Sequence, residues 1–476
     1  MQINTIMMEY LILVPEITLL LGACVVLLGG AFAAHYRQSL FYLTQTVLFV
    51  VLALSVAPFN SQARELFNGF YIIDGLAIFA KTSMCVLMIV VLIYSRRYIE
   101  THKFPAGEYY ALALFALLGM MLMSSASHLL MIYLGLELLS LCMYALVAMD
   151  RDNSISSEAA IKYFVLGAIA SGFLLYGISL IYGLTGSLYL SQLTLVSEAG
   201  IGIIAAVIFI VIGLAFKLGA VPFHMWLPDV YQGAPLSVAL LIGSVPKIAG
   251  LLLALRLLMD GVPWMHQYWQ QSLIVLSVLS LLVGNIVAIA QTSLRRMLGY
   301  STIGHVGYIL LGLSVGNVQG YSAALFYTLI YALMSSATFG ALLMSERMQR
   351  PLEQLSDLRG LAKPYPWLAF LLLLLMFSMA GIPMTVGFYA KLQILQALVA
   401  NNGLILALIA VVSSVIGAFY YLRVIKLMYF DDNDIRPIEG SMPAAHISVL
   451  SVHALLVVGL FFFPQALIQI CQQVFS

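Results

Sequence analysis

Long apolar runs constrain this chain more than any other feature of its sequence. Run after run carries almost no charge over about 20 residues, the length that an α-helix needs to cross the hydrocarbon core of a bilayer. Of the 476 residues, 63% are apolar and 9% are charged, whereas soluble domains carry about 25% charged residues. A transmembrane β-barrel would show alternating segments of about 10 residues instead. The sequence therefore predicts an all-α polytopic membrane protein.

Fourteen apolar segments are expected to span the membrane. They lie at residues 10–31, 40–58, 71–94, 109–125, 128–149, 160–184, 201–235, 236–259, 272–291, 298–315, 321–344, 367–399, 404–428 and 447–471. The first segment follows an acidic residue, Glu9, and has no basic region or cleavage site before it. We interpret it as a retained helix rather than a signal peptide.

The loops between these segments set the expected orientation through their lysines and arginines. The side of the N-terminus holds Arg64 and Arg256, and the opposite side holds fourteen basic residues. The fourteen are Arg37, Arg96, Arg97, Lys103, Arg151, Arg295, Arg296, Arg347, Arg350, Arg359, Lys363, Arg423, Lys426 and Arg436. We therefore expect the second side to be cytoplasmic and both termini to face outward.

Several classes of site find no support in the sequence. A net charge of +1 gives no footprint for nucleic acid. The four cysteines, Cys24, Cys85, Cys142 and Cys471, are scattered singly, without the spacing of a disulfide framework or an iron–sulfur site. Neither a phosphate-binding glycine loop nor a set of metal ligands is present. We expect no metal, nucleotide or redox centre in this chain.

Five basic residues fall inside apolar segments, and all five are lysines: Lys81, Lys162, Lys217, Lys247 and Lys391. A lysine at the centre of a membrane helix costs about 2.5–3.5 kcal/mol on insertion scales. A buried lysine can release its proton near neutral pH, whereas arginine cannot. Snorkelling or static ion pairing is a sufficient explanation for Lys81 and Lys162, which lie near segment ends, but a poor one for the other three.

Lys162 has an acidic partner four residues earlier, Glu158, on the same helix face. Two roles remain open for this pair on equal terms. It either anchors the helix or forms a proton entrance near the cytoplasm.

Two segments are too long for a single crossing. Residues 201–235 and 367–399 number 35 and 33, about 50 Å each as straight helices against a hydrocarbon core of about 30 Å. Each contains an internal break, at Gly219 to Pro222 and at Gly381 to Pro383. Proline removes one helical hydrogen bond, so we expect a carbonyl to be freed at each break.

The freed carbonyls are expected to be those of Leu218 and Met379, and such backbone survives only within protein or beside a wet cavity. Each break lies close in sequence to a lysine, Lys217 or Lys391. Five segments separate the two breaks, which is typical of inverted repeats with discontinuous helices. We predict three N-terminal helices (1–108), two inverted five-helix repeats (109–259 and 260–430) and a C-terminal helix (431–476).

Glu137 is the only acid at the centre of any predicted segment. A lone carboxylate in hydrocarbon requires a basic partner or water, and Lys217 in the same repeat is the natural partner. We hypothesise a switchable pair: breaking it would desolvate both groups and favour their neutral forms, so a proton transfer would then cost little. A static structural pair is the alternative.

Other residues extend this series. Pro246 kinks the eighth segment and precedes Lys247, which is placed to accept a proton from Lys217. His305 lies between Lys247 and Lys391 in the sequence, and the imidazole ring suits proton transfer. A single histidine in an apolar segment is just as often a hydrogen-bonded structural residue, so both roles stay open for His305 and for His224, beside the first break.

Three stretches resemble a known family. Residues 216–235 (FKLGAVPFHMWLPDVYQGAP) and 380–391 (AGIPMTVGFYAK) match its two broken-helix signatures. Between them, Gly284, Asn285, Gln291, Arg295, Arg296, Tyr300, Ser301, His305, Gly307 and Tyr308 match as well. The family is that of antiporter-like proton-pumping subunits, found in respiratory complex I, in membrane-bound hydrogenases and in Mrp-type sodium/proton antiporters. The similarity covers nearly the whole chain.

The resemblance implies a translocase subunit in a bacterial inner membrane, with both termini in the periplasm. It implies proton translocation through Glu137, Lys217, Lys247 and Lys391, driven by electron transfer from NADH to quinone elsewhere in the complex. FMN, iron–sulfur clusters, NADH and quinone would belong to partner subunits, and the neighbours of this chain would be other antiporter-like and small helical membrane subunits. An Mrp-type antiporter component, a hydrogenase subunit and a silent scaffold are the alternatives.

Overall fold

The computed structural model describes residues 12–32, 37–57, 63–193, 200–347, 352–431 and 444–475, and these are almost entirely helical. The chain divides into two compact units. Unit 1 comprises Met1–Leu214, Ile248–Trp269 and Val474–Ser476, and unit 2 comprises Ala215–Lys247 and Gln270–Gln473. These units group residues by packing, so the four-part division expected from the sequence stays a prediction.

Unit 1 begins with three helices and a short hairpin. Its elements are α2 (Val14–Phe32), α3 (Arg37–Val56), β1 (Arg64–Leu66), β2 (Tyr71–Ile73), α4 (Gly75–Thr101), α5 (Ala106–Ser124), α6 (Leu129–Val147), α7 (Ser154–Thr185), α8 (Leu190–Leu193), most of α9 (Ile201–Leu218), the end of α12 (Val245–Ala254), η1 (Leu255–Gly261) and η2 (Pro263–Met265). The two strands pair antiparallel, with Arg64 opposite Ile73.

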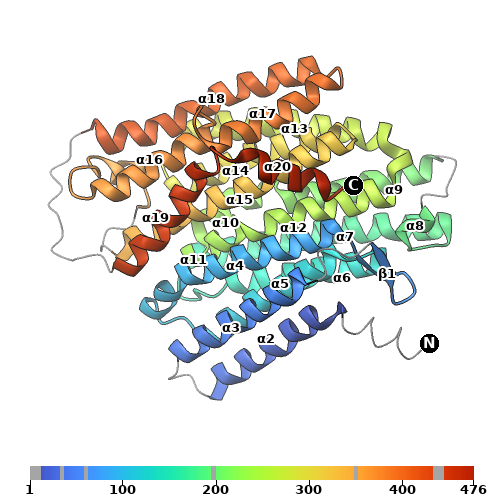
Figure 1. The fold of residues 1–476 in the computed structure, drawn as a ribbon, viewed down its shortest axis with the longest axis horizontal. Helices are drawn as coiled ribbons and strands as arrows, with labels where there is room; N and C mark the ends of the chain where they lie inside the picture. Colours follow the sequence, from blue (N-terminus) through green and yellow to red (C-terminus); the bar gives the residue numbers. More distant parts are fainter. Residues whose placement is uncertain are drawn as a thin grey trace. The chain divides into compact units, whose positions relative to one another are not determined.

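Helix α5 is the centre of unit 1 and contacts α2, α3, α4 and α6 (Figure 1). Glycines allow the backbones to approach: a Cβ on Gly30 of α2 would lie 2.5 Å from the Cα of Gly107 of α5. A Cβ on Gly119 of α5 would likewise lie 2.5 Å from the carbonyl oxygen of Gly135 of α6. Small residues at such crossings are typical of membrane helix packing.

Unit 2 holds both predicted breaks. Its elements are the end of α9, α10 (Trp226–Gly233), α11 (Leu236–Ile242), the start of α12, most of α13 (His266–Ala290), α14 (Leu294–Ser314), α15 (Val318–Arg347), η3 (Leu355–Leu358), α16 (Pro366–Ala380), α17 (Val386–Ala400), α18 (Leu404–Tyr429), α19 (Ala444–Gly459) and α20 (Pro464–Gln473). Helix α15 forms the core of the unit and contacts α11, α14, α16, α17, α19 and α20.

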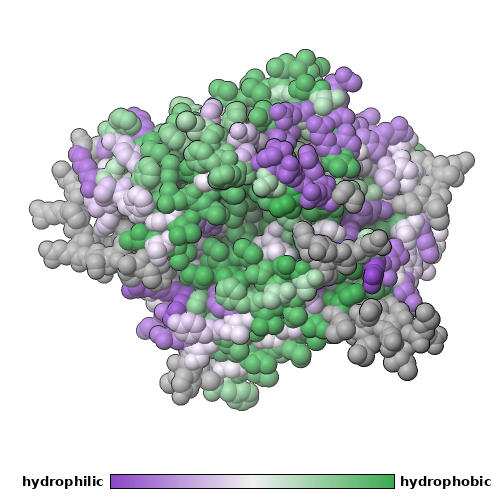
Figure 2. All heavy atoms as spheres, in the orientation of Figure 1, coloured by the Kyte–Doolittle hydropathy of each residue, from purple (hydrophilic) through white to green (hydrophobic). Residues whose placement is uncertain are grey.

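Membrane-spanning capacity follows the prediction closely. Within the described residues, eleven helices are long and apolar enough to cross a bilayer. The remaining three predicted segments correspond to α14, to the pair α16 and α17, and to the pair α19 and α20. The fold is therefore the predicted all-α polytopic one, with apolar side chains over much of the visible surface (Figure 2).

One predicted segment is corrected by the structure, and several predicted positions lie outside the residues that it describes. The sequence predicts residues 447–471 as one membrane helix, but the structure has two helices, α19 and α20, bent by 80° at the break between Gly459 and Pro464. Proline at the start of α20 and the glycine at the end of α19 explain why the helix does not continue. The predicted segment ends at Tyr10 and Pro58, and the loop residues Arg350 and Arg436, lie outside the described residues.

Candidate functional site

The first helix break lies where the sequence predicts it. Helix α9 ends at Leu218, because Gly219 adopts a left-handed conformation (φ +86°) that favours glycine. Pro222 then removes a backbone donor, and the chain resumes as α10 at Trp226. The amide of Val221 in the break donates to Ser280 Oγ at 2.9 Å, which fixes the connecting backbone to α13.

The carbonyls at the end of α9 are satisfied by specific partners. The indole Nε1 of Trp226 donates to the carbonyl of Phe216 at 3.0 Å. The ammonium of Lys247 donates to the carbonyl of Leu218 at 3.2 Å. The carbonyl that the sequence predicts to be freed at this break is thus bound by one of the predicted relay lysines.

Lys247 is 2% exposed, and its Nζ lies 5.8 Å from the centroid of the Trp226 ring. Helix α12 begins at Val245, so Pro246 stands at its second position, and a short break separates it from α11. Lys217 occupies the last turn of α9, with Nζ 5.8 Å from the Phe216 ring. Both cations therefore lie at a helix C-terminus, the negative end of the helix dipole.

The second break has the same design. Helix α16 ends at Ala380, and Gly381 follows in the left-handed conformation (φ +80°). Pro383 lies in the connecting turn, before α17 begins at Val386. Lys391 of α17 donates to the carbonyl of Ala380 at 2.7 Å. The bound carbonyl is thus one residue beyond the predicted Met379, because the glycine, rather than the proline alone, ends the helix.

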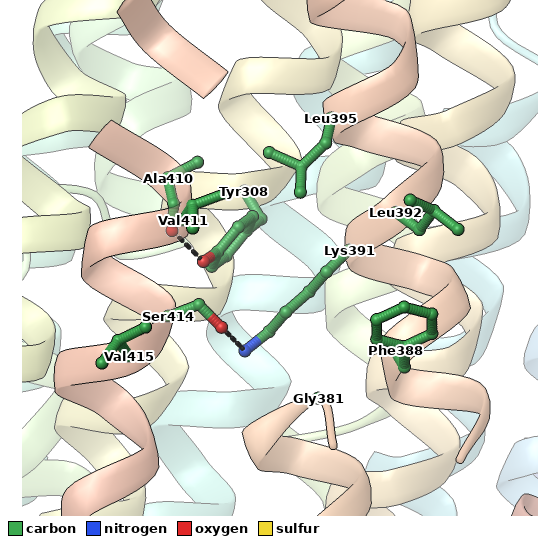
Figure 3. A pocket seen from close by; sticks show the side chains of 10 residues that line it. All are labelled: Tyr308, Gly381, Phe388, Lys391, Leu392, Leu395, Ala410, Val411, Ser414 and Val415. Atoms are coloured by element: carbon green, nitrogen blue, oxygen red, sulfur yellow. Dashed lines mark hydrogen bonds between the residues drawn. The ribbon is translucent and has the colours of Figure 1, made fainter. Parts of the chain in front are cut away.

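Lys391 also donates to Ser414 Oγ of α18 at 2.9 Å, and its Nζ lies 5.3 Å from the Tyr308 ring of α14 (Figure 3). A Cβ on Gly381 would lie 2.8 Å from Lys391 Cδ, so a larger residue would obstruct the lysine stem. A cavity of about 180 Å³ adjoins these side chains, lined otherwise by apolar residues such as Phe388 and Val411. The ammonium is therefore one of few polar groups facing this space.

His305 of α14 is bonded through both ring nitrogens. Nδ1 lies 2.7 Å from Tyr327 Oη of α15, and Nε2 lies 3.0 Å from Tyr421 Oη of α18. Tyr308 stacks on Tyr327 with ring centroids 5.4 Å apart. Because the Tyr308 ring also faces the ammonium of Lys391, it links His305 and its partner Tyr327 to the Lys391 site. Hydroxyls both donate and accept, so this geometry fits either role that the sequence left open.

A cluster of hydroxyls around α14 was not predicted. Thr302 Oγ1 lies 2.7 Å from Tyr331 Oη and donates to Tyr231 Oη of α10 at 3.4 Å, while Ser301 hydrogen-bonds to Tyr421. The cluster joins the second half of one broken helix to α14, α15 and α18. Polar residues at helical spacing, Ser301, His305 and Tyr308, were the sequence signal for it.

Arg295 and Arg296, which the sequence predicts in a loop as a topology signal, lie instead in the first turn of α14 and make specific contacts. Arg296 Nη1 lies 2.6 Å from Asp229 Oδ1 and 3.2 Å from Gln232 Oε1, both on α10. Arg295 Nη1 donates to the carbonyl of Ala234, just past the end of α10, at 3.1 Å. The two arginines therefore hold α10, the short helix after the first break.

Two of the predicted site residues, Glu137 and His224, take no part in the hydrogen bonds that Lys247 and Lys391 make to the helix ends. Glu137 lies in α6, and its Oε1 is buried with no hydrogen-bond partner among the described residues. Glu137 belongs to unit 1 and Lys217 to unit 2, so their pairing stays a prediction. His224 lies in the first break, and its ring centroid is 6.4 Å from that of Tyr300.

The remaining sequence expectations concern Lys162 and Arg256. Lys162 Nζ lies 2.7 Å from Glu158 Oε1, which confirms the predicted ion pair. Arg256 was counted as a loop residue, but it is 1% exposed. It lies in η1, where two carboxylates compensate its charge.

The fold and the site define a class of protein: a multi-pass helical membrane protein with two interrupted helices, in each of which the last carbonyl accepts a hydrogen bond from a buried lysine. Residues 126–417 match the model of the NADH:quinone oxidoreductase/Mrp antiporter transmembrane family. The chain belongs to this family.

Three similar proteins illustrate the relationship. NADH-quinone oxidoreductase subunit N of Thioalkalivibrio sulfidiphilus (strain HL-EbGR7) is 49% identical over 97% of both chains. Subunit N of Thiobacillus denitrificans (strain ATCC 25259 / T1) is 47% identical over 98% of both. A chain of respiratory complex I from Thermus thermophilus, solved with bound aureothin, is 30% identical, with a TM-score of 0.81 over 96% of this chain and 98% of that one.

Proposed function

We propose that this chain is the proton-translocating membrane subunit of an NADH:quinone oxidoreductase. It would couple electron transfer from NADH to quinone, in other subunits, to proton movement through Glu137, Lys217, Lys247 and Lys391. Curated relatives that share almost the full length of the chain are named subunit N of that enzyme, which supports the assignment. One structural observation carries it furthest: a buried lysine bound to the last carbonyl of each interrupted helix.

This contact links the charge of a lysine to the position of a helix end. An ammonium donates strongly to a carbonyl at the negative end of a helix dipole. When the helix end moves away, the buried cation loses its acceptor, and desolvation then favours release of its proton. Lys247 and Lys391 would each hold a proton in one arrangement of the break and release it in the other.

The remaining parts of the proposal concern the assembly. FMN, iron–sulfur clusters and the NADH and quinone sites would lie in partner subunits, and no metal-ligating group of three or more residues occurs in the described part of this chain. Its neighbours would be other antiporter-like and small helical membrane subunits within a bilayer. We place it in a bacterial inner membrane, with both termini periplasmic and the repeats 109–259 and 260–430 inverted.

Replacement of Lys217 by alanine tests the function directly. Inverted membrane vesicles from cells that carry the variant complex should retain assembly but lose NADH-driven acidification, measured with a pH-sensitive dye. Lys426→Ala is the matched control, because Lys426 lies at the end of α18 with its side chain 70% exposed. Assembly and pumping at wild-type levels in Lys217→Ala would favour a scaffold role.

Two further measurements separate the alternatives. Glu137→Lys should be worse than Glu137→Gln if Glu137 pairs with a cation, because it places two positive charges in a medium of low dielectric. Genes for flavin and iron–sulfur subunits beside this one would favour the oxidoreductase over a sodium/proton antiporter without a redox partner. Sodium-dependent, NADH-independent proton exchange in vesicles would favour the antiporter.

A further inference from the structure

A second group of buried titratable side chains lies in unit 1, on α2, β2 and α4. Lys81 Nζ lies 2.6 Å from Glu16 Oε1 and donates to Tyr71 Oη at 2.6 Å. The Tyr71 hydroxyl in turn donates to Glu16 Oε1 at 2.9 Å. All three side chains are nearly inaccessible, with 2–4% of each residue exposed. We call Glu16, Tyr71 and Lys81 the α2–α4 triad.

The triad differs from both roles that the sequence suggested for Lys81. Snorkelling is excluded, because the residue is 4% exposed and its ammonium is bonded inside the unit. A purely static pair leaves one atom unexplained: Glu16 Oε2 is buried and has no hydrogen-bond partner among the described residues. An ionised carboxylate oxygen without a donor is costly in such a place. The triad thus holds an open position where one proton can add.

A second charged network lies close to the triad, since Lys81 is within electrostatic reach of Asp74. Asp74, three residues after Tyr71, forms a bidentate pair with Arg256, at 2.8 Å for both bonds. Arg256 Nη1 also binds Asp260 at 2.8 Å. The side chains of Asp74 and Asp260 are 20% and 29% exposed, whereas that of Arg256 is 2% exposed. The two carboxylates of this network are therefore partly exposed, on either side of a buried guanidinium.

The charge of the combined group favours proton uptake. Glu16, Asp74 and Asp260 supply three negative charges, and Lys81 and Arg256 supply two positive ones. The formal charge of these five side chains is −1, and Glu16 is the one of the three carboxylates that is buried. A proton bound at Glu16 would relieve the cost of burying that charge. Cys85, fully buried on α4, is a further titratable side chain in electrostatic reach of Glu16 and Lys81.

We propose that the α2–α4 triad is a proton-exchange site of this chain, separate from the lysines at the two helix breaks. A proton from the aqueous phase adds to Glu16 Oε2 and converts the carboxylate to a carboxylic acid. Lys81 remains an ammonium, with Tyr71 as its acceptor, and loss of the same proton restores the ion pair.

Infrared difference spectroscopy of the purified complex tests the protonation step. Spectra recorded at two pH values should contain a carboxylic acid carbonyl band that Glu16→Gln removes. Glu100→Gln is the matched control, since Glu100 forms an i,i+4 pair with Arg96 on α4 and its side chain is 35% exposed. Loss of the band in Glu16→Gln alone supports the proposal, and a full band in Glu16→Gln overturns it.

Lys81→Arg tests whether the triad exchanges protons during turnover, and this arm rests on the proposed function. Arginine keeps the positive charge but binds the carboxylate more permanently, so we expect fewer protons per NADH oxidised while NADH oxidation continues. A wild-type ratio in Lys81→Arg would show a static ion pair and overturn the proposal. The infrared measurement does not depend on proton pumping through Lys217. A failure of the proposed function and a failure of the proposed site can therefore be told apart.

Should Glu16→Gln fail to assemble, Tyr71→Phe carries the infrared test. It retains the Glu16–Lys81 ion pair and removes only the bridging hydroxyl. Its carboxylic acid band should shift in frequency, and an unshifted band would contradict a site at Glu16.

Discussion

Lys247 donates a hydrogen bond to the carbonyl of Leu218, the last residue of α9. Lys391 makes the equivalent bond to Ala380, the last residue of α16. Both carbonyls belong to a helix end, where no backbone donor follows in sequence. In each case, therefore, a buried ammonium group satisfies the last carbonyl of a helix that ends at a break. Whether the lysine keeps this hydrogen bond depends on the position of the helix end.

Arginine at position 247 separates capping from proton transfer. Lys247→Arg keeps a donor for the Leu218 carbonyl, so the complex should assemble, but NADH-driven pumping should be lost because arginine keeps its proton. Lys247→Met removes the donor as well and should destabilise unit 2 by about 1–3 kcal/mol, the cost of an unsatisfied buried acceptor. Thermal unfolding of the purified complex and dye-based acidification measure the two effects. Pumping at the wild-type rate in Lys247→Arg would contradict a relay role for this residue.

Ser414 supplies the second hydrogen bond to Lys391, and its removal should slow the relay without breaking the fold. Ser414→Ala leaves the ammonium bound to Ala380 alone, a loss of about 1 kcal/mol that corresponds to roughly a fivefold change in pumping rate at constant assembly. Ser413→Ala is the matched control, because Ser413 Oγ is buried and has no hydrogen-bond partner among the described residues. The control should pump like the wild type. Equal effects of the two substitutions would rule out a specific role for the Ser414 bond.

The sequence predicted the features that depend on local chemistry. The apolar runs gave the spans, and the pairs Gly219–Pro222 and Gly381–Pro383 gave both breaks, because glycine and proline act on the backbone within a few residues. Lysines near those breaks were identified because charge in hydrocarbon is expensive wherever it occurs. These properties do not require knowledge of which helices are neighbours.

Partners in space were harder to predict. The bond of Lys247 to Leu218 and that of Lys391 to Ser414 join residues that are 29 and 23 positions apart. Arg256 pairs with Asp74 across 182 positions, whereas the count of basic residues treats it as a loop residue at the end of the predicted segment 236–259. Such contacts arise from the packing of helices, which apolar periodicity barely constrains when a helix is apolar on every side.

The Arg296–Asp229 pair should contribute to the position of α10. Arg296→Ala removes contacts to Asp229 and Gln232 at once. We expect it to lower the free energy of unfolding by about 1 kcal/mol, the upper part of the range for partly exposed pairs. Arg359→Ala is the control, because its guanidinium lies 3.8 Å from Asp431 and its side chain is 53% exposed. Thermal unfolding of the complex should show a shift for Arg296→Ala only, and the reverse order would contradict the role of this pair.

Gly387 provides the most direct test of the geometry of the second break. A Cβ at this position would lie 1.9 Å from the carbonyl oxygen of Ser378, so α17 could approach α16 this closely only with glycine. Gly387→Ala should displace the two half-helices and cost about 1–3 kcal/mol, as overpacking of a tight core does. It should also reduce pumping, because Lys391 lies on α17 and its acceptor Ala380 on α16, so a displacement of the two helices would lengthen their hydrogen bond.

Gly172→Ala in α7 is the matched control, because a Cβ there meets nothing within 4 Å. Its effect on stability should stay within about 0.5 kcal/mol. Wild-type stability and pumping in Gly387→Ala would show that the two halves of the broken helix do not pack at this distance.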